Sequence, residues 1–321
     1  MKVLITGITG QDGIFLVRKL LKEYRDIEIL GISRLLKTNS FLKLAKINNL
    51  KKNQKLNLVS VDLKNSYFVE QTLFDFFPDK VFNLAGPSSV YESIVNPDLE
   101  EDIKIIFTNL CNSLIKKNNF CTFFQASTSE MYGLNNQLIR YDENSEFQPN
   151  SPYAKGKLHN HLKISQLRKK YDWDISSGIM FNHESEFRKD NYLFIKLINS
   201  AYDIKHKKVD KFTVGSLDYS RDWSYAADIS EGIFAISKFG ESFDYVLGSG
   251  VETEIRKVIE IIFSSFNLNY ENFIEVDAKI LRKNDPIRMV SNPSKIKNEI
   301  GWETNTPIEK VIELMIKSKF K

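Results

Sequence analysis

Two groups of side chains in this sequence could carry out acid–base chemistry together. One is the polar segment 127–130, which follows an apolar run and places Glu130 two residues after Thr128. The other is Tyr153 with Lys157, whose spacing of four residues puts both on one face of a helix. An ammonium group lowers the pKa of a nearby phenol, so the phenol can act as a base, and a carboxylate can move a second proton. The alternative for 127–130 is a solvated surface turn.

The Tyr-x-x-x-Lys spacing alone decides little, because it occurs a second time at Tyr192 and Lys196. A chain with 13 tyrosines and many lysines is expected to contain such matches by chance. Tyr153 follows the hydroxyl-rich segment after one loop, whereas Tyr192 follows a charged segment with no comparable partner. Position therefore favours Tyr153 as the base, and we interpret Tyr192 as the chance match.

A glycine-rich turn near the N-terminus predicts a dinucleotide site. Residues 2–6 form a short apolar strand, and Gly7, Gly10 and Gly13 follow at intervals of three before a helical pattern begins at Ile14. Strand, glycine turn and helix in this order bring backbone N–H groups and a helix N-terminus to a pyrophosphate. The flanking elements make this signal stronger than a glycine triplet alone.

The rest of the first half alternates strands with helices. This pattern predicts an α/β fold of the Rossmann type, with a doubly wound parallel sheet and a smaller C-terminal α/β lobe for the substrate. Ligands of such a sheet bind at the carboxyl ends of its strands. The expected strands are 27–32, 57–61, 80–84 and 121–126, and the expected helices are 66–77, 99–117 and 153–170.

The end of the second strand helps to choose the cofactor. Ser33 and Arg34 stand where an acidic residue would bind the ribose 2′-hydroxyl of NAD. A hydroxyl and a guanidinium suit a 2′-phosphate better, so we predict NADP, with NAD less favoured. The alternative is that Arg34 is a solvated loop residue.

Composition narrows the class of protein. The net charge is +4 over 321 residues, and the lysines are dispersed, which suits small phosphate-bearing molecules and not nucleic acid. Cys111 and Cys121 lack metal-type spacing, so we expect two reduced thiols, no metal and a cytoplasmic location. No apolar run is long enough to span a membrane, and no secretory signal precedes the first strand.

Several motifs together resemble the GDP-mannose 4,6-dehydratase family, within the extended short-chain dehydrogenase/reductase superfamily. They are GITGQDG, FQASTSEMYG, SPYAKGK, FNHES at 181–185, SLDYSRDWSYAADI at 216–229 and NEIGW at 298–302. The resemblance covers nearly the whole chain. Gln-Asp in the glycine turn and Asn-His-Glu-Ser after Phe181 carry the likeness to this family in particular.

The resemblance implies a role for individual residues. The implied catalytic residues are Thr128, Glu130, Tyr153 and Lys157. The implied cofactor-binding residues are Gly7, Thr9, Gly10, Gln11, Asp12, Gly13, Arg34, Asp62, Leu63, Leu84, Ser88, Tyr153, Lys157, His183 and Arg188. The implied substrate-binding residues are Ser88, Thr128, Asn182, Arg221 and Arg282. The lobes are expected to interleave, with residues 1–178 and 212–248 binding the cofactor and residues 179–211 and 249–321 binding the nucleotide sugar.

The implied reaction converts a GDP-hexose, GDP-mannose first, to its 4-keto-6-deoxy form with a recycled NADP. Oxidation alone needs only a hydroxyl and the Tyr–Lys pair, whereas elimination of water needs an acid–base group such as Glu130. Other GDP-sugars (a heptose or N-acetylglucosamine) remain alternatives. An epimerase, reductase or decarboxylase of the same fold and a non-catalytic NADP-binding sensor or scaffold also remain open.

Departures from the family pattern fall on the substrate side. Residues 186–189 replace Pro-Arg-Arg-Gly, Ile195 replaces an arginine, and residues 85–89 replace Gly-Ala-Gln-Ser-His. These departures leave the identity of the sugar in the substrate open. Leu35 also replaces an arginine in a region that resembles one used for tetramer contacts, so both a homodimer and a homotetramer are expected possibilities.

Some remaining residues receive a structural interpretation. The apolar stripes of helices 99–117 and 153–170 would suit a dimer bundle, although such stripes more often belong to a core. We expect three histidines to face solvent, namely His159, His161 and His206, and three tryptophans to serve packing, namely Trp173, Trp223 and Trp302.

Overall fold

The computed structural model describes residues 1–34, 50–134, 140–281 and 285–320. The predictions for Leu35 and Arg282 lie outside these described residues. Within the described ranges, no helix combines the length and the apolar character needed to cross a membrane.

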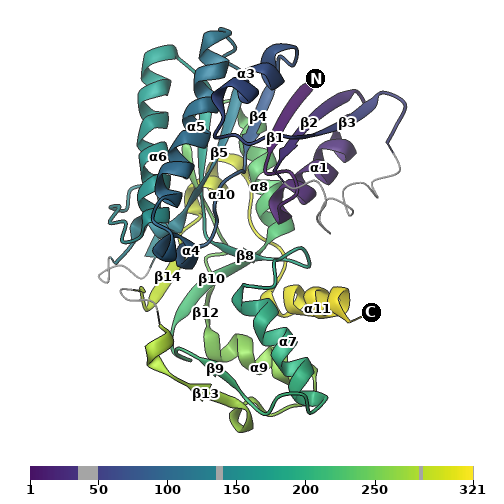
Figure 1. Cartoon of the computed structure of the whole chain (residues 1–321), viewed down its shortest axis with the longest axis vertical. Helices are drawn as coiled ribbons and strands as arrows, with labels where there is room; N and C mark the ends of the chain where they lie inside the picture. Colours follow the sequence, from purple (N-terminus) through teal and green to yellow (C-terminus); the bar gives the residue numbers. More distant parts are fainter. Residues whose placement is uncertain (35–49, 135–139, 282–284, 321) are drawn as a thin grey trace.

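A seven-stranded parallel sheet forms the upper part of the molecule (Figure 1). Its strands, in spatial order, are β11 (Asp244–Leu247), β7 (Ile175–Met180), β5 (Thr122–Thr128), β4 (Lys80–Asn83), β1 (Lys2–Thr6), β2 (Ile27–Ser33) and β3 (Gln54–Ser60). Every neighbouring pair is parallel. The predicted doubly wound α/β fold is therefore confirmed, although β3 begins three residues before the expected strand and β5 extends to Thr128.

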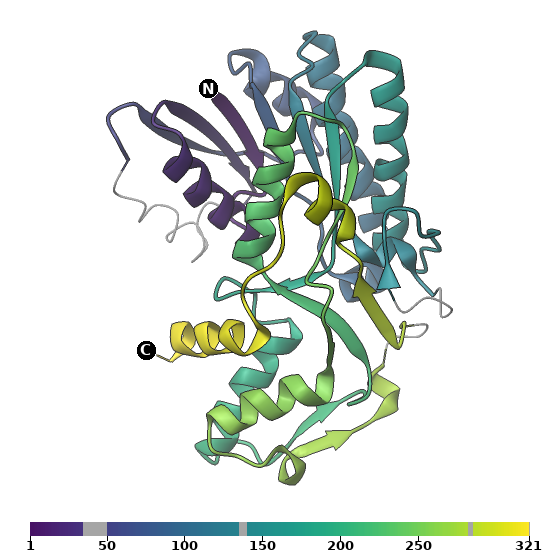
Figure 2. The same cartoon turned by 180° about the vertical axis from the view of Figure 1, so that it is seen from behind.

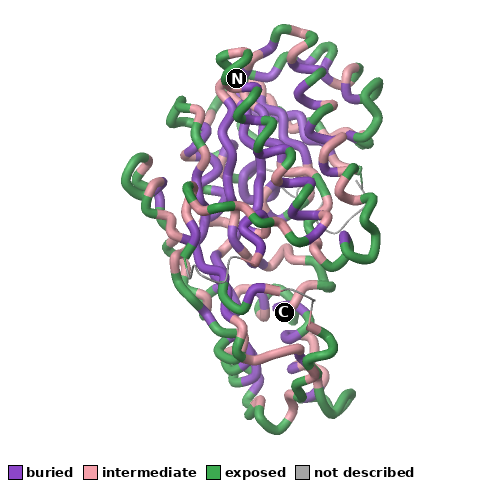
Figure 3. The backbone as a smooth tube through the Cα atoms, turned by 90° about the vertical axis from the view of Figure 1, so that its left-hand side faces the viewer, coloured by how far each residue is buried: buried purple, intermediate pink, exposed green. Residues whose placement is uncertain are grey.

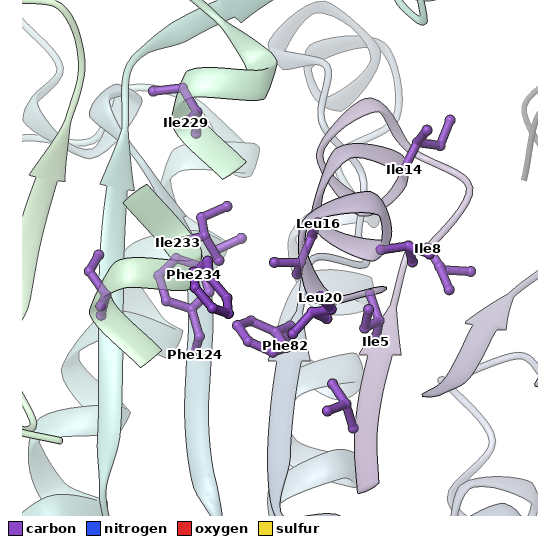
Figure 4. Packing of buried hydrophobic residues seen from close by; sticks show 14 of the residues in the cluster. Ile5, Ile8, Ile14, Leu16, Leu20, Phe82, Phe124, Ile229, Ile233 and Phe234 are labelled. Carbon is purple, nitrogen blue, oxygen red and sulfur yellow. The ribbon is translucent and has the colours of Figure 1, made fainter. Parts of the chain in front are cut away.

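Both faces of this sheet are covered by helices, because alternate side chains of each strand point to opposite faces. Val3 and Ile5 pack with α1 (Gln11–Glu23) and α8 (Ala226–Phe239) on one face. Figure 4 shows Ile5, Phe82 and Phe124 of the sheet beside residues of these two helices. Leu4 belongs to the cluster on the other face, which contains residues of α3 (Ser66–Phe74), α5 (Leu99–Lys116) and α6 (Pro152–Tyr171).

Strand β1 lies between β2 and β4, so the chain winds away from it in two directions. Such a point opens a crevice beyond the carboxyl ends of the strands. Buried polar side chains line the approach to it: the Thr6 hydroxyl donates to Asn83 at 2.6 Å, and the Asn83 amide donates to Gln125 at 2.7 Å. The sheet therefore ends in a fixed polar row on which a site can be built.

The lower part of the molecule has its own hydrophobic cluster. It contains residues of α7 (Leu193–Lys205), α9 (Ile255–Ser265) and α11 (Ile308–Lys319), with the pair β9 (Phe212–Val214) and β13 (Ile274–Val276) beside them (Figure 1). Trp302 and, in α10 (Ser294–Ile300), Ile296 pack with the large sheet instead, and α10 lies in front of this sheet in the view of Figure 2. The exact lobe boundaries stay a prediction.

A small sheet joins the two parts. It consists of β12 (Glu252–Glu254), β10 (Ser220–Tyr225), β14 (Arg288–Ser291) and β6 (Arg140–Tyr141), and β8 (Asn182–Glu184) also pairs with β10. The buried Asp222 carboxylate accepts hydrogen bonds from the backbone N–H groups of Ser249, Gly250 and Ser291. Because Asp222 follows Arg221, this network fixes the strand that carries a predicted substrate residue.

The apolar stripe of α5 is used within the chain. Gly156 of α6 packs so closely that a side chain there would meet the backbone of Glu100. The apolar residues of the stripe are all buried, namely Ile103, Ile106, Phe107, Leu110 and Leu114. Figure 3 shows the strands of the sheet as the most continuously buried part of the backbone. The stripe thus belongs to the core, and the homodimer or homotetramer stays a prediction.

The three tryptophans are buried, which confirms their packing role. His159 and His206 are exposed as expected, but the solvent prediction is wrong for His161, which is only 8% exposed. Its ring bonds Ser177 at 3.1 Å and approaches Asp244 at 3.5 Å. The lysine-rich sequence of α6 hid this, because His161 follows Lys157 by four residues on the face that meets the sheet.

Candidate active site

One cavity of about 1230 Å³ brings the predicted site together at the carboxyl ends of the sheet. Gly13 does not line it, and Arg282 lies outside the described residues. The other predicted residues all line it, namely Gly7, Thr9, Gly10, Gln11, Asp12, Arg34, Asp62, Leu63, Leu84, Ser88, Thr128, Glu130, Tyr153, Lys157, Asn182, His183, Arg188 and Arg221. Predicted residues as far apart in the sequence as Gly7 and Arg221 therefore line the same cavity.

The glycine turn is shaped to receive a diphosphate. Gly7 has a φ of +69°, and a Cβ there would lie 2.8 Å from the Leu84 backbone. Gly10 precedes α1 and provides no side-chain cap, which leaves the first-turn N–H groups without a side-chain acceptor at the cavity. A Cβ on Gly13 would lie 2.6 Å from the Ile8 backbone, so this glycine lets α1 pack against the turn. The cradle fits the pyrophosphate of a dinucleotide.

Four side-chain groups tie the glycine turn to a distant segment, and we call them the clasp: Gln11 and Asp12 with His183 and Ser185. Gln11 donates its amide to the His183 carbonyl at 2.9 Å and accepts from the Ser185 hydroxyl at 2.8 Å. His183 Nε2 lies 3.1 Å from the Asp12 carboxylate. The clasp therefore holds the start of α1 against the segment that contains β8.

The Asp12 carboxylate controls the charge of His183. The Nδ1 atom of His183 lies 2.7 Å from the Phe181 carbonyl, which can only accept, so Nδ1 carries a proton. Burial alone would lower the pKa of His183, but Asp12 opposes it and the net pKa is raised. The raised pKa favours the charged form of this ring, which lies beside the glycine turn where a dinucleotide phosphate would bind.

Tyr153 and Lys157, the predicted proton-accepting pair, lie near the start of α6. Ser151 caps this helix by accepting from the Ala154 N–H, and Pro152 occupies its first turn. Lys157 donates to the Ala126 carbonyl at 2.9 Å, and its Nζ lies 5.8 Å from the centre of the Tyr153 ring. Burial lowers the pKa of Lys157 to about 8. The lysine is thus held in place beneath the phenol.

The phenol and the hydroxyl-rich segment meet at the end of β5. Burial raises the pKa of Tyr153, while a hydrogen bond with Thr128 acts in the opposite direction. Residues 127–129 are buried, so the surface-turn alternative is wrong. A short 3₁₀ turn over Ser129–Tyr132 then places Glu130 on the cavity, with its N–H 3.3 Å from the Thr128 hydroxyl. An acid–base group and a phenol therefore face one space.

Tyr192 also lines this cavity, contrary to its interpretation as a chance match. The Tyr192 hydroxyl lies 2.8 Å from the Ser88 hydroxyl. The Arg188 guanidinium covers the Tyr192 ring at 3.6 Å from its centre, and Arg188 Nε lies 3.0 Å from the buried Glu184 carboxylate. Tyr192 stands immediately before α7 and not within it, so the helical spacing to Lys196 does not explain its position at the cavity.

The substrate side of the cavity carries Arg221 and Asn182. Arg221 donates through Nη2 to Asp285 at 2.7 Å and through Nη1 to the Ser220 carbonyl at 2.8 Å. Its terminal nitrogens are thus engaged at the cavity edge. Ile195, which replaces a family arginine, is almost fully buried and adds an apolar patch to the wall.

Residues 186–189, which depart from the family pattern, make local packing contacts. Phe187 packs on Phe15 with ring centres 5.2 Å apart, and the Arg18 guanidinium lies 5.2 Å from the centre of the Phe187 ring. Glu186 accepts a hydrogen bond from the Tyr225 hydroxyl at 3.1 Å. Aromatic and polar contacts with α1 and the small sheet therefore hold this segment at the cavity.

Comparison with known proteins decides the family. A family model described as "GDP-mannose 4,6 dehydratase" matches residues 4–315. The chain belongs to the GDP-mannose 4,6-dehydratase family. Among relatives, GDP-mannose 4,6 dehydratase 1 of Arabidopsis thaliana is 28% identical over 98% of this chain and 88% of its own length. The human GDP-mannose 4,6 dehydratase is 29% identical over 98% of this chain and 90% of its own length.

Solved structures agree on the fold. A dTDP-glucose 4,6-dehydratase from Streptomyces venezuelae, with NAD and TYD bound, has a TM-score of 0.87 at 21% identity and covers 99% of this chain and 96% of its own. A UDP-glucose 4-epimerase from Thermotoga maritima has a TM-score of 0.85 at 19% identity, covering 99% and 98%. This member of the GDP-mannose 4,6-dehydratase family thus shares its fold with both dehydratases and epimerases.

Proposed function

We propose that this protein is a nucleotide-sugar 4,6-dehydratase that converts a GDP-hexose, GDP-mannose first, to the GDP-4-keto-6-deoxy sugar with the elimination of water. The observation that carries the proposal is the convergence of Thr128, Glu130, Tyr153 and Lys157 on the cavity that begins at the glycine turn. An epimerase or reductase has no need of an acid–base group at Glu130. The complete set also disfavours a non-catalytic sensor or scaffold.

The cofactor site suits NADP. The glycine turn would hold the pyrophosphate, Asp62 and Leu63 would lie against the adenosine, and Arg34 would face the 2′-phosphate. When bound, the nicotinamide supplies redox chemistry by accepting a hydride from sugar C4 and returning it at C6. Lys157 and Tyr153 line the inner end of the cavity, where the sugar would meet it.

Tyr153 removes the proton of the C4 hydroxyl in the first step. Burial raises the pKa of this phenol, so the phenolate depends on nearby positive charge. Lys157, with a pKa of about 8, is mainly protonated at neutral pH and supplies that charge. The Thr128 hydroxyl, bonded to the phenol, is placed to hold the C4 oxygen.

Glu130 carries out the elimination. The C4 ketone acidifies the C5 hydrogen, and the carboxylate takes this proton. The resulting carboxylic acid then protonates the departing C6 hydroxyl, which leaves as water. Acid–base assistance of this kind contributes about 10²–10⁴-fold to a rate. One side chain two residues after Thr128 can therefore serve both proton transfers of the step.

The substrate remains the open part of the proposal. The apolar Ile195 in the wall favours testing GDP-sugars other than GDP-mannose as a second candidate group, including GDP-manno-heptose and GDP-N-acetylglucosamine. An NMR time course of the NADP-loaded protein with each sugar tests the function. A new C6 methyl doublet from a hexose, with a C4 ketone and no net NADPH, supports dehydration. Inversion at C4 without loss of water would support an epimerase instead.

Replacement of Glu130 by Gln tests the elimination step. We expect Glu130→Gln to lower turnover by about 10²-fold or more, because the amide cannot accept the C5 proton. The affinity for NADP should not change. Glu146→Gln is the matched control, because Glu146 is exposed and does not line the cavity. Near-normal turnover of Glu130→Gln would remove this residue from the mechanism.

Replacement of Arg34 by Ala tests the choice of cofactor. We expect the dissociation constant of NADP to rise about tenfold while that of NAD hardly changes, since one charge-assisted contact is lost. Arg25→Ala is the control, because Arg25 is exposed and outside the cavity. Equal losses for both cofactors would show that Arg34 does not read the 2′-phosphate.

A further inference from the structure

We propose that Tyr192 is a specificity-determining residue, whose hydroxyl forms with that of Ser88 a subsite for one hydroxyl of the sugar other than that at C4. This inference rests on the proposed function, because it assumes a nucleotide sugar in the cavity. It gives a role to the tyrosine of the second Tyr-x-x-x-Lys match, which the sequence led us to interpret as a chance match. Four observations on the wall of the cavity carry it.

The first observation is that two distant segments meet at this wall. Ser88 precedes α4 (Val90–Val95), and Tyr192 precedes α7, yet their hydroxyls are 2.8 Å apart. A second bridge lies beside them, where the Asn191 amide donates to the Glu92 carboxylate at 3.0 Å. Two side-chain bonds thus hold the segment after β4 against the segment that enters the lower part of the molecule.

The second observation is that the Tyr192 ring is held in one orientation. Arg188 lies over its face at 3.6 Å, a distance at which a guanidinium and an aromatic ring attract each other. Arg188 is itself fixed by the buried Glu184 carboxylate at 3.0 Å. A phenol fixed before the ligand arrives loses little entropy on binding, which favours a role in recognition.

The third observation is a count of protons. Each hydroxyl has one proton to donate, and only one of the two is used in the Ser88–Tyr192 bond. Within the part of the chain that the structure describes, neither hydroxyl has another hydrogen-bond partner. One proton and several lone pairs therefore face the cavity, and a sugar hydroxyl both donates and accepts in the same way.

The fourth observation is the position relative to the base. Burial raises the pKa of Tyr153 most, and the Glu130 carboxylate and the Tyr192 phenol raise it further. Tyr192 and Tyr153 line the same cavity, and the Tyr192 phenol contributes to the raised pKa of the group that takes the C4 proton. A sugar whose C4 hydroxyl reaches Tyr153 would bring a neighbouring ring substituent toward the Ser88–Tyr192 pair.

Calorimetry on protein loaded with NADPH, which cannot accept the hydride from C4, tests the subsite independently of turnover. GDP and GDP-mannose are the probes, because only the second carries a sugar, and each variant is compared with wild type for the same probe. We expect Tyr192→Phe to raise the dissociation constant of GDP-mannose about five- to tenfold, which is the effect of one lost hydrogen bond, and to leave that of GDP unchanged. Ser88→Ala should have the same effect, and the double variant should lose little more than either.

Deoxy analogues identify the hydroxyl and supply the sharper readout. For one of GDP-2-deoxymannose and GDP-3-deoxymannose, wild-type protein and Tyr192→Phe should bind equally well, because the partner of the phenol is already absent. An equal loss for all three sugars would overturn the subsite, as would no loss for any of them. A fall in NADP affinity without a change for GDP-mannose would assign the pair to the cofactor and also overturn it.

Controls distinguish a failure of the proposed subsite from a failure of the proposed dehydratase activity. Tyr171→Phe removes a hydroxyl from a tyrosine outside the cavity and should change no dissociation constant. Equal melting temperatures of wild type and Tyr192→Phe would exclude a general loss of structure. If wild type binds GDP-mannose more tightly than GDP but forms no 4-keto sugar, the dehydratase proposal fails while the subsite stands. If wild type does not distinguish GDP-mannose from GDP, the subsite fails.

Discussion

The two Tyr-x-x-x-Lys pairs have the same spacing and line the same cavity, but their surroundings differ. Tyr153 and Lys157 are 8% and 6% exposed, in the first turns of a helix packed on the sheet. Tyr192 is partly exposed and precedes its helix, and Lys196 is exposed. Among the residues that the structure describes, a backbone carbonyl fixes the first lysine near its tyrosine but not the second. Spacing brings a phenol and an ammonium to one side of a helix, and burial decides whether they can do proton chemistry.

The largest expected effect is a loss of kcat when the tyrosine hydroxyl of the first pair is removed, and the same change in the second pair is its comparison. Tyr153→Phe should lower kcat by about 10³-fold or more, because the base for the C4 proton is lost. Tyr192→Phe should change kcat by less than about threefold and act on KM, because it affects binding alone. Steady-state kinetics with GDP-mannose measures both. Similar losses of kcat would show that the two phenols share the proton transfer.

A pH profile sharpens the comparison by following the buried lysine. The pKa of Lys157 is about 8, so the ammonium that supports the phenolate is lost as pH rises through that value. We expect kcat to fall above about pH 8, approaching tenfold per pH unit for a single essential proton. The profile of Lys196→Met should keep this fall. A profile that is flat to pH 10 would contradict the role of Lys157.

The smallest expected effect concerns the stability of the helix that carries the first pair. His161→Ala should lower the free energy of unfolding by about 1–3 kcal/mol, because Ser177 loses a buried partner. His159→Ala, on the exposed side of the same helix, should stay within about 0.5 kcal/mol. Urea unfolding measures both. Equal stability of the two variants would contradict a structural role for His161.

His161 also leads to a prediction about how the stability of the protein depends on pH. Burial lowers the pKa of His161 below its ordinary value of 6.5, although Asp244 opposes this. The unfolded chain therefore binds a proton more readily, and the contribution of His161 to stability is lost as pH falls from 6.5 toward the lower pKa of the folded state. The stability difference between wild type and His161→Ala should shrink over that range.

Much of the fold and of the cofactor side could be predicted from the sequence, because both depend on local patterns. Apolar runs set the strands of the parallel sheet, and a strand followed by Gly7 and Gly10 defines a diphosphate cradle by backbone shape alone. Tyr153 could be selected because it follows a polar strand end by one loop. These inferences needed no knowledge of how distant segments meet.

The features that were missed depend on contacts between distant segments. Tyr192 gained its place from Ser88, which lies 104 residues away, and no local pattern signals such a pair. His161 was read as solvated because lysines surround it in sequence, whereas the pattern of buried residues at intervals of four from Tyr153 could have indicated its face. The engagement of Arg221 with Asp285 likewise joins residues 64 positions apart.

The clasp has a consequence for the order in which the protein matures. Gln11 bonds a carbonyl 172 residues further along the chain, so the glycine turn cannot take its final shape from neighbouring residues alone. A chain emerging from the ribosome can form β1 and α1 early, but Ser185 must leave the exit tunnel before the clasp closes. Contacts of such long sequence separation form late in folding. Tight capture of the dinucleotide would therefore mark a chain whose first 185 residues have already been assembled.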